Sequence, residues 1–281
     1  KDMVAAFDRN FEYFLKVKES RGILNTNLYW DATRHVVAKT GKLPMIYLTD
    51  ARLNDTVREL AEKRLGLRYE KAKCRFFQNR PRFGETYIEQ AYLKSIKGAE
   101  NEILIANAYL VASKTLVEAV KDAARRCVKV TILTNSPETN DLPMLTIVGR
   151  DYYDDMLAVN DEPIFQSCEK GGVQIWEWQG RRSMASEQSE GTMHAKYAVF
   201  DRRVAIVGSY NMDPRSRMLN SESAIVFENE TLSGQLADMF YRNDLDFSRQ
   251  ITLEEAKSFA ESTDVVYKLE EELGILFKDS L

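Results

Sequence analysis

The amino-acid sequence predicts an α/β fold in which a mixed β-sheet is flanked by helices. The first observation is a β-α-β pattern, with strand-like apolar runs at 102–110 and 128–133 and helical periodicity at 113–126 between them. The second is a pair of short apolar runs, 196–200 and 204–207, which a polar turn joins into a hairpin. The composition, 44% hydrophobic and 29% charged, is ordinary for a globular protein with such a core.

Helical patterns precede this unit. Residues 2–20 carry aromatic and aliphatic side chains at helical spacing, and residues 31–70 are also mostly helical in pattern, most clearly at 53–65. The turn-rich sequence 79–84 (NRPRFG) follows and marks a boundary. We therefore expect a helical N-terminal region over residues 1–83.

The remaining elements follow in order after the second strand. They are a helix at 151–157, a strand at 173–178, a polar loop at 181–191, the hairpin, a strand at 223–227, a helix at 232–243 and a charged helical segment at 253–281. These patterns predict a sheet-bearing domain over residues 84–246 and a helical C-terminal tail over residues 247–281.

Charge and cysteine content limit the functional classes. The formal net charge of −4 disfavours a general nucleic-acid-binding surface, which is usually basic. The three cysteines, Cys74, Cys127 and Cys168, are odd in number and widely spaced, so the sequence predicts neither a disulfide framework nor a zinc site. Their pattern fits a thiol-reducing compartment. Since no apolar run reaches about 18 residues, we expect no transmembrane segment.

Two residues at the start of the hairpin can carry chemistry together. His194 and Lys196 are two positions apart, so both side chains point to the same face of a strand. The lysine ammonium can hold a phosphate oxygen by charge, and the imidazole can attack phosphorus or protonate a leaving oxygen. Either residue alone would more often be a packing or surface residue, so the hypothesis depends on their combination with the residues that follow.

The following residues complete a candidate site for an anionic oxygen ligand. Gly208 permits close approach of the backbone, and Ser209 and Asn211 supply hydrogen-bond donors for phosphate oxygens. We expect Glu222 to accept the second imidazole N–H and to fix its tautomer. We expect Asp201, in the turn of the hairpin, to have a structural role.

The combined pattern resembles the phospholipase D superfamily. Its HxKxxxxD signature occurs at residues 194–201, and a GSxN sequence follows at residues 208–211. The continuation at 213–222 (DPRSRMLNSE) is similar to bacterial cardiolipin synthases, especially those of type C. The resemblance covers residues 84–246. Weaker signals of the same branch are Tyr109 within NAYLVAS and residues 133–136 (LTNS) followed by Asp141.

The resemblance implies a phospholipase D-like fold and phosphodiester chemistry through a phosphohistidine. It implies that His194 is one of two active-site histidines and that Glu222 orients it. It further implies that Lys196 and Asn211 bind phosphate oxygens, with Ser209 assisting. The implied substrate is a phospholipid, phosphatidylglycerol or phosphatidylethanolamine, met by peripheral contact with a bacterial membrane, the cytoplasmic face being favoured. It implies no cofactor and no metal.

One HxK motif is present, whereas the superfamily combines two at a single site. The other histidine, His35, lacks this spacing, and we expect it to be structural or on the surface. Residues 7–14 (FDRNFEYF) resemble the helix that closes the first half of two-motif enzymes. Residues 1–83 would then contain the end of a missing first half and a connecting region, and His194 would be the general acid/base. Alternatively, a two-fold dimer brings two copies of His194 together. In both cases an isolated monomer is expected to be nearly inactive.

Four functions are compatible with the motif. A phosphatidyltransferase of the cardiolipin synthase type comes first, and a phospholipase D-type hydrolase second, because the motif does not distinguish an alcohol acceptor from water. A single-motif dimeric nuclease is disfavoured by the acidic charge, and a non-catalytic membrane-binding module by the intact motif. For a lipid substrate, the candidates for an acyl path, with core packing as the commoner role, are Tyr152, Tyr153, Met156, Leu157, Trp176 and Trp178.

Overall fold

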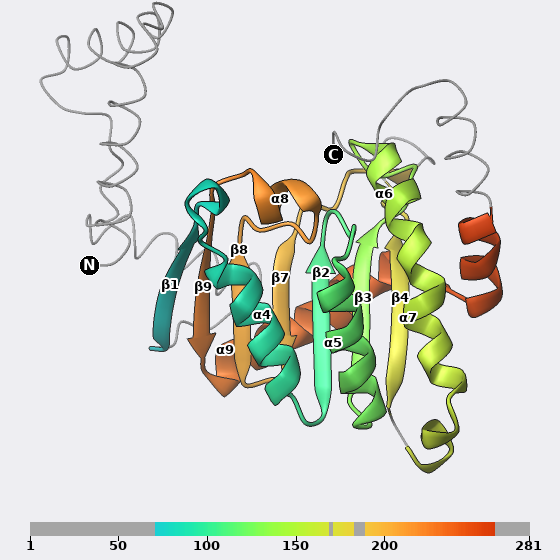
Figure 1. Ribbon diagram of the computed structural model, residues 1–281, viewed down its shortest axis with the longest axis horizontal. Helices are drawn as coiled ribbons and strands as arrows, with labels where there is room; N and C mark the ends of the chain where they lie inside the picture. The colour runs from blue at the N-terminus through green and yellow to red at the C-terminus, as the bar shows by residue number, and fades with distance from the viewer. Residues whose placement is uncertain (1–70, 169–170, 183–188, 262–281) are drawn as a thin grey trace, which may run out of the picture. The chain divides into compact units, whose positions relative to one another are not determined.

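The computed structural model describes residues 71–168, 171–182 and 189–261, which belong to one compact unit of the chain. An eight-stranded sheet with the order β1-β9-β8-β7-β2-β3-β4-β10 forms its centre (Figure 1). The strands are β1 Lys73–Asn79, β2 Glu102–Asn107, β3 Lys129–Asn135, β4 Gly172–Trp178, β7 Lys196–Phe200, β8 Val204–Gly208, β9 Glu222–Glu228 and β10 Ser248–Ile251. Strands β2, β3 and β4 are parallel, and all other pairs are antiparallel. The predicted mixed sheet is therefore confirmed.

Helices cover both faces of this sheet, as expected (Figure 1). One face packs against α4 (Tyr87–Gly98), α5 (Lys114–Arg125) and α7 (Tyr153–Ala158), and the other against α9 (Glu230–Met239) and the π-helical turn Phe240–Asp244. Two further helices, α6 (Pro143–Gly149) and α8 (Pro214–Met218), lie in connections at one end of the sheet. No helix among the described residues is long and apolar enough to cross a bilayer.

The β2-α5-β3 unit illustrates how the sequence produces these layers. Five of the six residues of β2 and six of the seven of β3 are buried, because helices cover both faces of the sheet at its centre. Helix α5 buries one stripe, Leu116, Val117, Val120, Ala123 and Ala124, at the spacing of a helical face. The Ser113 hydroxyl accepts the Leu116 N–H and caps the first turn.

Both edge strands were missed by the sequence analysis. Strand β1 (KCRFFQN) and strand β10 (SRQI) lie outside the predicted range 84–246, at opposite edges of the sheet. Each carries exposed charged or polar side chains, because an edge strand is only partly covered, so neither shows the apolar pattern of a central strand. The predicted polar loop at 181–191 contains two antiparallel strands of two residues each, β5 (Arg181–Arg182) and β6 (Ser189–Glu190). The helical N-terminal region and most of the helical tail lie outside the described residues, although residues 253–261 are helical.

A disulfide between Cys127 and Cys168 corrects the expectation that the cysteines do not pair. The two residues are 41 positions apart in sequence, but their Cα atoms are 5.3 Å apart, because α5 ends beside the turn that leads into β4. Cys74 is exposed and free. Disulfides are typical of oxidising compartments, so the cysteine content no longer supports the reducing compartment inferred from the sequence.

Replacing Cys168 with serine is expected to lower the free energy of unfolding by about 2–4 kcal/mol, because the cross-link restricts the unfolded chain over a long loop. Thermal unfolding of the oxidised protein would measure the loss. The Cys74→Ser variant is the matched control and should unfold like the parent protein. Equal midpoints for Cys168→Ser and the parent protein, with the parent disulfide verified by mass, would contradict this prediction.

Candidate active site

The predicted site residues meet at one end of the sheet, which we call the histidine end. Here β2 and β3 finish and β7 and β9 begin, with Asn107 paired to Lys196 and Asn79 paired to Glu222. Because parallel strands end together and their antiparallel neighbours start there, the loops after β1, β2 and β3 converge with those before β7 and β9. The HxK segment therefore lies where several loops can contribute side chains.

The buried side chain of Asn135 fixes the backbone next to His194. Its Nδ2 donates to the carbonyl oxygen of Met193 at 2.8 Å, and its Oδ1 accepts the Met193 N–H at 3.0 Å. The same amide donates to the carbonyl of Ala108 at 3.0 Å, so the end of β3 is tied to both neighbouring chain segments. The Ala108 N–H in turn donates to the carbonyl of Ala195 at 2.9 Å. These bonds set the position from which the imidazole projects.

Tyr109 lies against both members of the HxK pair. Its ring meets the exposed His194 ring edge to face, with centroids 6.0 Å apart. The Nζ atom of Lys196 is 5.6 Å from the centroid of the tyrosine ring and also donates to the carbonyl oxygen of His194 at 3.1 Å. The Tyr109 hydroxyl donates to Asp141 at 2.7 Å. Burial, with help from this carboxylate, raises the pKa of Tyr109 to about 12, so the hydroxyl remains a donor at neutral pH.

Lys196 remains available to an anionic ligand. Within the described residues it makes no ion pair, although Glu222, Asp141 and Asp213 lie close enough to stabilise its charge. Partial burial opposes them and lowers the pKa of Lys196 below its usual value. An ammonium group that is partly desolvated and lacks a fixed counter-ion is suited to hold a phosphate oxygen.

Glu222 is bound to two serine hydroxyls. It accepts a short hydrogen bond from Ser209 and a second from Ser216 at 3.0 Å. Ser216 also accepts the backbone N–H of Asn211 at 3.2 Å, and the side-chain oxygen of Asn211 is buried without a hydrogen-bond partner. Among the described contacts there is none between Glu222 and His194, so the orienting role of this carboxylate stays a prediction. Ser209, Asn211 and Glu222 are thus brought together through a residue, Ser216, that sequence analysis gave no role.

Two further motif residues, Gly208 and Asp201, act on the backbone of neighbouring strands. Gly208 is where β8 and β9 approach each other closely, since a Cβ atom there would lie 2.2 Å from the carbonyl oxygen of Ser223. Asp201 lies at the opposite end of β7, in the turn before β8, with a φ of 51°. Its carboxylate accepts the backbone N–H groups of three consecutive residues at 2.7–2.9 Å, Glu100, Asn101 and Glu102. These bonds tie the far end of the motif strand to the start of β2.

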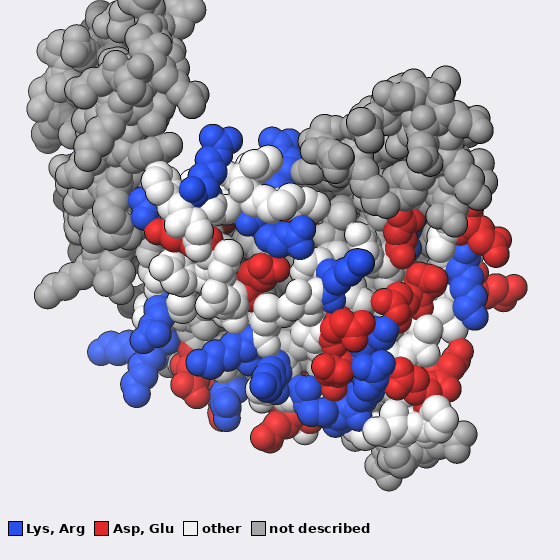
Figure 2. Space-filling model, in the orientation of Figure 1, with Lys and Arg blue, Asp and Glu red and all other residues white. Residues whose placement is uncertain are grey.

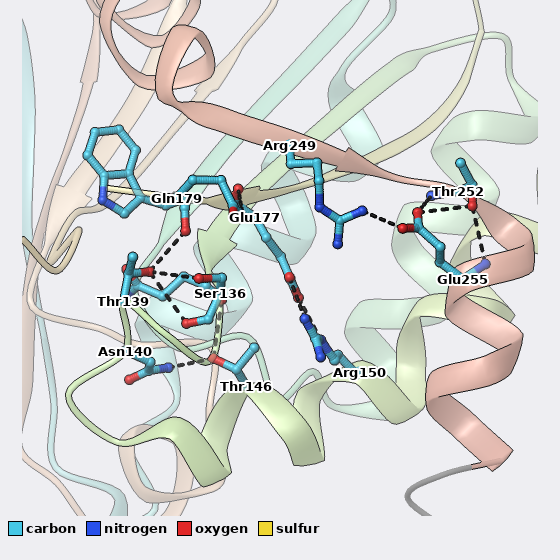
Figure 3. Close-up of polar contacts among 12 residues, drawn as sticks. Ser136, Thr139, Asn140, Thr146, Arg150, Glu177, Gln179, Arg249, Thr252 and Glu255 are labelled. Carbon is cyan, nitrogen blue, oxygen red and sulfur yellow. Dashed lines mark hydrogen bonds and ion pairs between the residues drawn. The ribbon is translucent and has the colours of Figure 1, made fainter. Parts of the chain in front are cut away.

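A polar network holds the loop that carries Asp141 (Figure 3). The Thr139 hydroxyl donates to the carbonyl of Trp178 at 2.9 Å, and the Asn140 amide donates to the Thr146 hydroxyl at 2.7 Å. Behind them, Arg150 makes a two-bond ion pair at 2.8 and 2.6 Å with Glu177, which is fully buried on β4. The loop is thereby fixed to the sheet from both sides.

Four of the six side chains considered for an acyl path are buried in the interior. Tyr153, Met156 and Leu157 pack between α7 and the sheet, and Trp178 packs on the other face. Tyr152 and Trp176 are partly buried against these hydrophobic clusters, so the positions fit the core-packing role that is the commoner one. The described residues contain no group of three or more His, Cys, Asp or Glu side chains that could hold a metal ion.

Removing the Tyr109 hydroxyl with Tyr109→Phe is expected to lower turnover by about three- to tenfold, because the ring stays but its bond to Asp141 is lost. Tyr109→Leu, which also removes the ring beside His194 and Lys196, should have the larger effect. Steady-state kinetics would measure both, with kcat falling more than KM rises. Tyr241→Phe is the matched control, since it breaks a 2.6 Å tyrosine–carboxylate bond to Glu102 at the opposite end of the sheet. Equal losses in Tyr241→Phe and Tyr109→Phe would contradict a role for Tyr109 in positioning.

Comparison with known proteins gives a consistent result. A family model described as "Cardiolipin synthase, PLD-like domain" matches residues 92–243, which is more than half of the chain. The chain is 32% identical over 151 residues to cardiolipin synthase B of Salmonella typhi, covering 54% of this chain and 31% of that protein. It is 28% identical over 175 residues to cardiolipin synthase A of Proteus mirabilis, covering 62% of this chain and 31% of the relative. The chain thus spans about a third of the length of these relatives.

A solved structure shows the same fold. The phosphatidylserine synthase of Haemophilus influenzae Rd KW20 superposes with a TM-score of 0.53 at 12% sequence identity, covering 84% of this chain and 56% of that one. At this identity the likeness concerns the arrangement of strands and helices alone.

Proposed function

The chain belongs to the cardiolipin synthase family of phospholipase D-like proteins, and from this premise we propose that it is a phosphatidyltransferase acting on glycerophospholipids through His194. The observation that carries the proposal is the exposed imidazole beside Lys196, an ammonium that makes no ion pair among the described residues. Ser209 and Asn211 lie at the same end of the sheet and supply further groups for phosphate oxygens.

The proposed reaction has two steps. An imidazole nitrogen attacks the phosphorus of the lipid, an N–P bond forms, and the P–O bond to the first alcohol breaks while a second imidazole gives that oxygen its proton. The hydroxyl of an acceptor then loses its proton to the second imidazole and attacks phosphorus, which breaks the N–P bond and restores both groups. Lys196 holds a non-bridging phosphate oxygen in both steps. His194 is one of these two imidazoles, and we assign it the acid/base role.

The second imidazole is proposed to come from another phospholipase D-like half or from a second copy of the chain. The exposure of His194 supports this, because one side of its ring contacts Tyr109 while the ring remains accessible. An isolated monomer of this chain would then be nearly inactive. We further propose that residues 84–246 carry the catalytic part of the domain, whose sheet also includes the edge strands β1 and β10. Residues 1–83 would then contain the end of a missing first half and a connecting region, and residues 247–281 would form a tail.

The substrate is proposed to be phosphatidylglycerol or phosphatidylethanolamine, reached by peripheral contact with a bacterial membrane. Whether an alcohol or water is the final acceptor depends on how well the assembled site excludes water. The cytoplasmic face stays a prediction, and the Cys127–Cys168 pair argues for an oxidising side instead.

Product analysis tests this function directly. The purified protein would be incubated with phosphatidylglycerol vesicles, and the lipids would be identified by mass spectrometry. Cardiolipin as the main product supports the transferase, whereas phosphatidic acid alone supports the hydrolase. If neither forms, the assay is repeated with the full reading frame that contains this chain. Absence of both products there, together with cleavage of single-stranded DNA, would replace the lipid function with a nuclease.

A further inference from the structure

Six large apolar side chains are exposed at the histidine end of the sheet. They are 40–53% exposed and comprise Phe83, Tyr87, Leu142, Met144, Met218 and Leu219. We call this set the apolar rim. It comes from four separate segments: the turn after β1, the first residue of α4, the start of α6 and the end of α8. Each segment lies at this end because β1 and β3 finish there and β9 begins there.

Among the residues that the structure describes, no comparable group of exposed apolar side chains lies at the other end of the sheet. Of the other exposed large apolar side chains described, Val207 and Ile225 are cross-strand neighbours on a sheet face, and Phe247 lies against Trp178. Ile164, 46% exposed, lies in the turn before β4 at the opposite end. Single exposed apolar residues are ordinary, but their concentration at one end marks an interaction surface.

Arginine side chains accompany the apolar rim. Arg82 precedes Phe83, and Arg215 lies one helical turn before Met218 and Leu219. Both arginines are exposed, and neither forms an ion pair with another described residue. Figure 2 shows Lys and Arg side chains along the upper edge of the described part of the chain, with uncharged residues between them. Apolar tips interleaved with cations suit the boundary between anionic headgroups and acyl chains.

We propose that the apolar rim is the surface by which this protein enters the headgroup layer of a phospholipid bilayer. This inference rests on the proposed function, because the phosphate of a bilayer lipid lies in that layer and must reach Lys196. An approach through the histidine end brings the ammonium to the phosphate while the rim side chains enter the first carbon layer. Asp141, the exposed carboxylate next to Leu142, is held by Tyr109 and so is turned toward the site.

Vesicle binding by the whole chain tests the proposal. The variant Phe83→Ser/Met218→Ser/Leu219→Ser would be compared with Ile164→Ser, which removes one exposed apolar side chain at the opposite end. Flotation with vesicles of equal phosphatidylcholine and phosphatidylglycerol should show a partition coefficient at least about tenfold lower for the triple variant. Ile164→Ser should bind like the parent protein. Circular dichroism and thermal unfolding would establish that each variant is folded.

A second variant changes only exposed charged side chains of the same surface, so it tests the proposal without removing apolar side chains. Arg82→Gln/Arg215→Gln should retain binding to vesicles but lose much of the increase in binding that phosphatidylglycerol produces. Equal binding by the triple variant and the parent protein would overturn the proposal. So would a triple variant that binds vesicles normally but loses a dimer in sedimentation, because the rim would then be a protein–protein contact. Binding needs no turnover, so a full reading frame that contains this chain, binds through the rim and forms no lipid product would count against the proposed function alone.

Discussion

Replacing His194 with alanine is expected to lower phosphodiester turnover by at least about 10²–10⁴-fold, the range that general acid/base catalysis supplies. The loss should appear in kcat, because the imidazole acts on the reacting atoms while Lys196 still binds phosphate. Initial rates of lipid product formation by the full reading frame that contains this chain, followed by mass spectrometry, would measure it. The fold should be unaffected, because the His194 side chain is exposed.

The control for this change is the second histidine of the chain. His35 lacks the HxK spacing, so His35→Ala should retain the turnover of the parent protein. Turnover in His194→Ala within twofold of the parent protein would remove this residue from the chemistry. Titrating parent protein with His194→Ala protein adds a further distinction. If two copies share a site, the activity of the mixture falls below the value expected from dilution of the parent protein alone. If the full reading frame that contains this chain supplies the second imidazole itself, the activity follows dilution.

The Asn135→Ala variant is expected to lose both stability and turnover. It leaves the Met193 N–H and the Met193 carbonyl without their partner, while the Ala108 carbonyl keeps the Thr134 hydroxyl at 3.4 Å. Each buried unsatisfied group costs about 1–3 kcal/mol, so the total is roughly 2–6 kcal/mol. The segment that carries His194 then lacks its attachment to β3. Turnover per folded molecule should fall by at least about tenfold, since small displacements of reacting groups are costly. Urea unfolding and kinetics on the same preparation would measure the two losses.

A matched control for this variant exists at the other end of the sheet. The amide of Asn160 binds Val173 in the same two-bond manner, with an Nδ2 to carbonyl distance of 2.8 Å and an N–H to Oδ1 distance of 2.7 Å. Asn160→Ala should therefore lose stability but keep its turnover per folded molecule. If the two variants lost turnover equally, Asn135 would be a general stabilising residue without a positioning role.

The central elements were predictable because their patterns are local. The β2-α5-β3 unit and the β7-β8 hairpin were placed within a few residues, since buried strands are continuous apolar runs and the helix repeats at its own period. The edge strands β1 and β10 were not, because pairing with a neighbour, rather than their own polar sequences, makes them strands. The family motif predicted the segment that carries the candidate site.

The hydrogen bonds that hold that segment and its neighbours in place could not be predicted from one sequence. Asn135 and Met193 are 58 positions apart, and Tyr109 and Asp141 are 32 apart, so only the folded chain brings them together. Both Asn135 and Tyr109 occurred in the segments that carried the family resemblance, which was the signal that they matter. The Cys127–Cys168 pair was missed for the same reason, because spacing does not report distance in space.

The attachment of β7 at both ends has a consequence for how the site moves. This strand lies between β2 and β8, Asp201 holds one of its ends, and Asn135 holds the residue before its motif at the other. Such a segment opens only when the sheet itself opens, so its amides should be among the slowest to exchange with solvent deuterium. The hydroxyls of Ser209 and Ser216 lie in the connection between β8 and β9, which the buried Asn107 side chain ties to the end of β2 through Tyr210 and Met212. Both sides of the candidate site are therefore attached to the sheet, and we expect it to keep its geometry before a substrate binds.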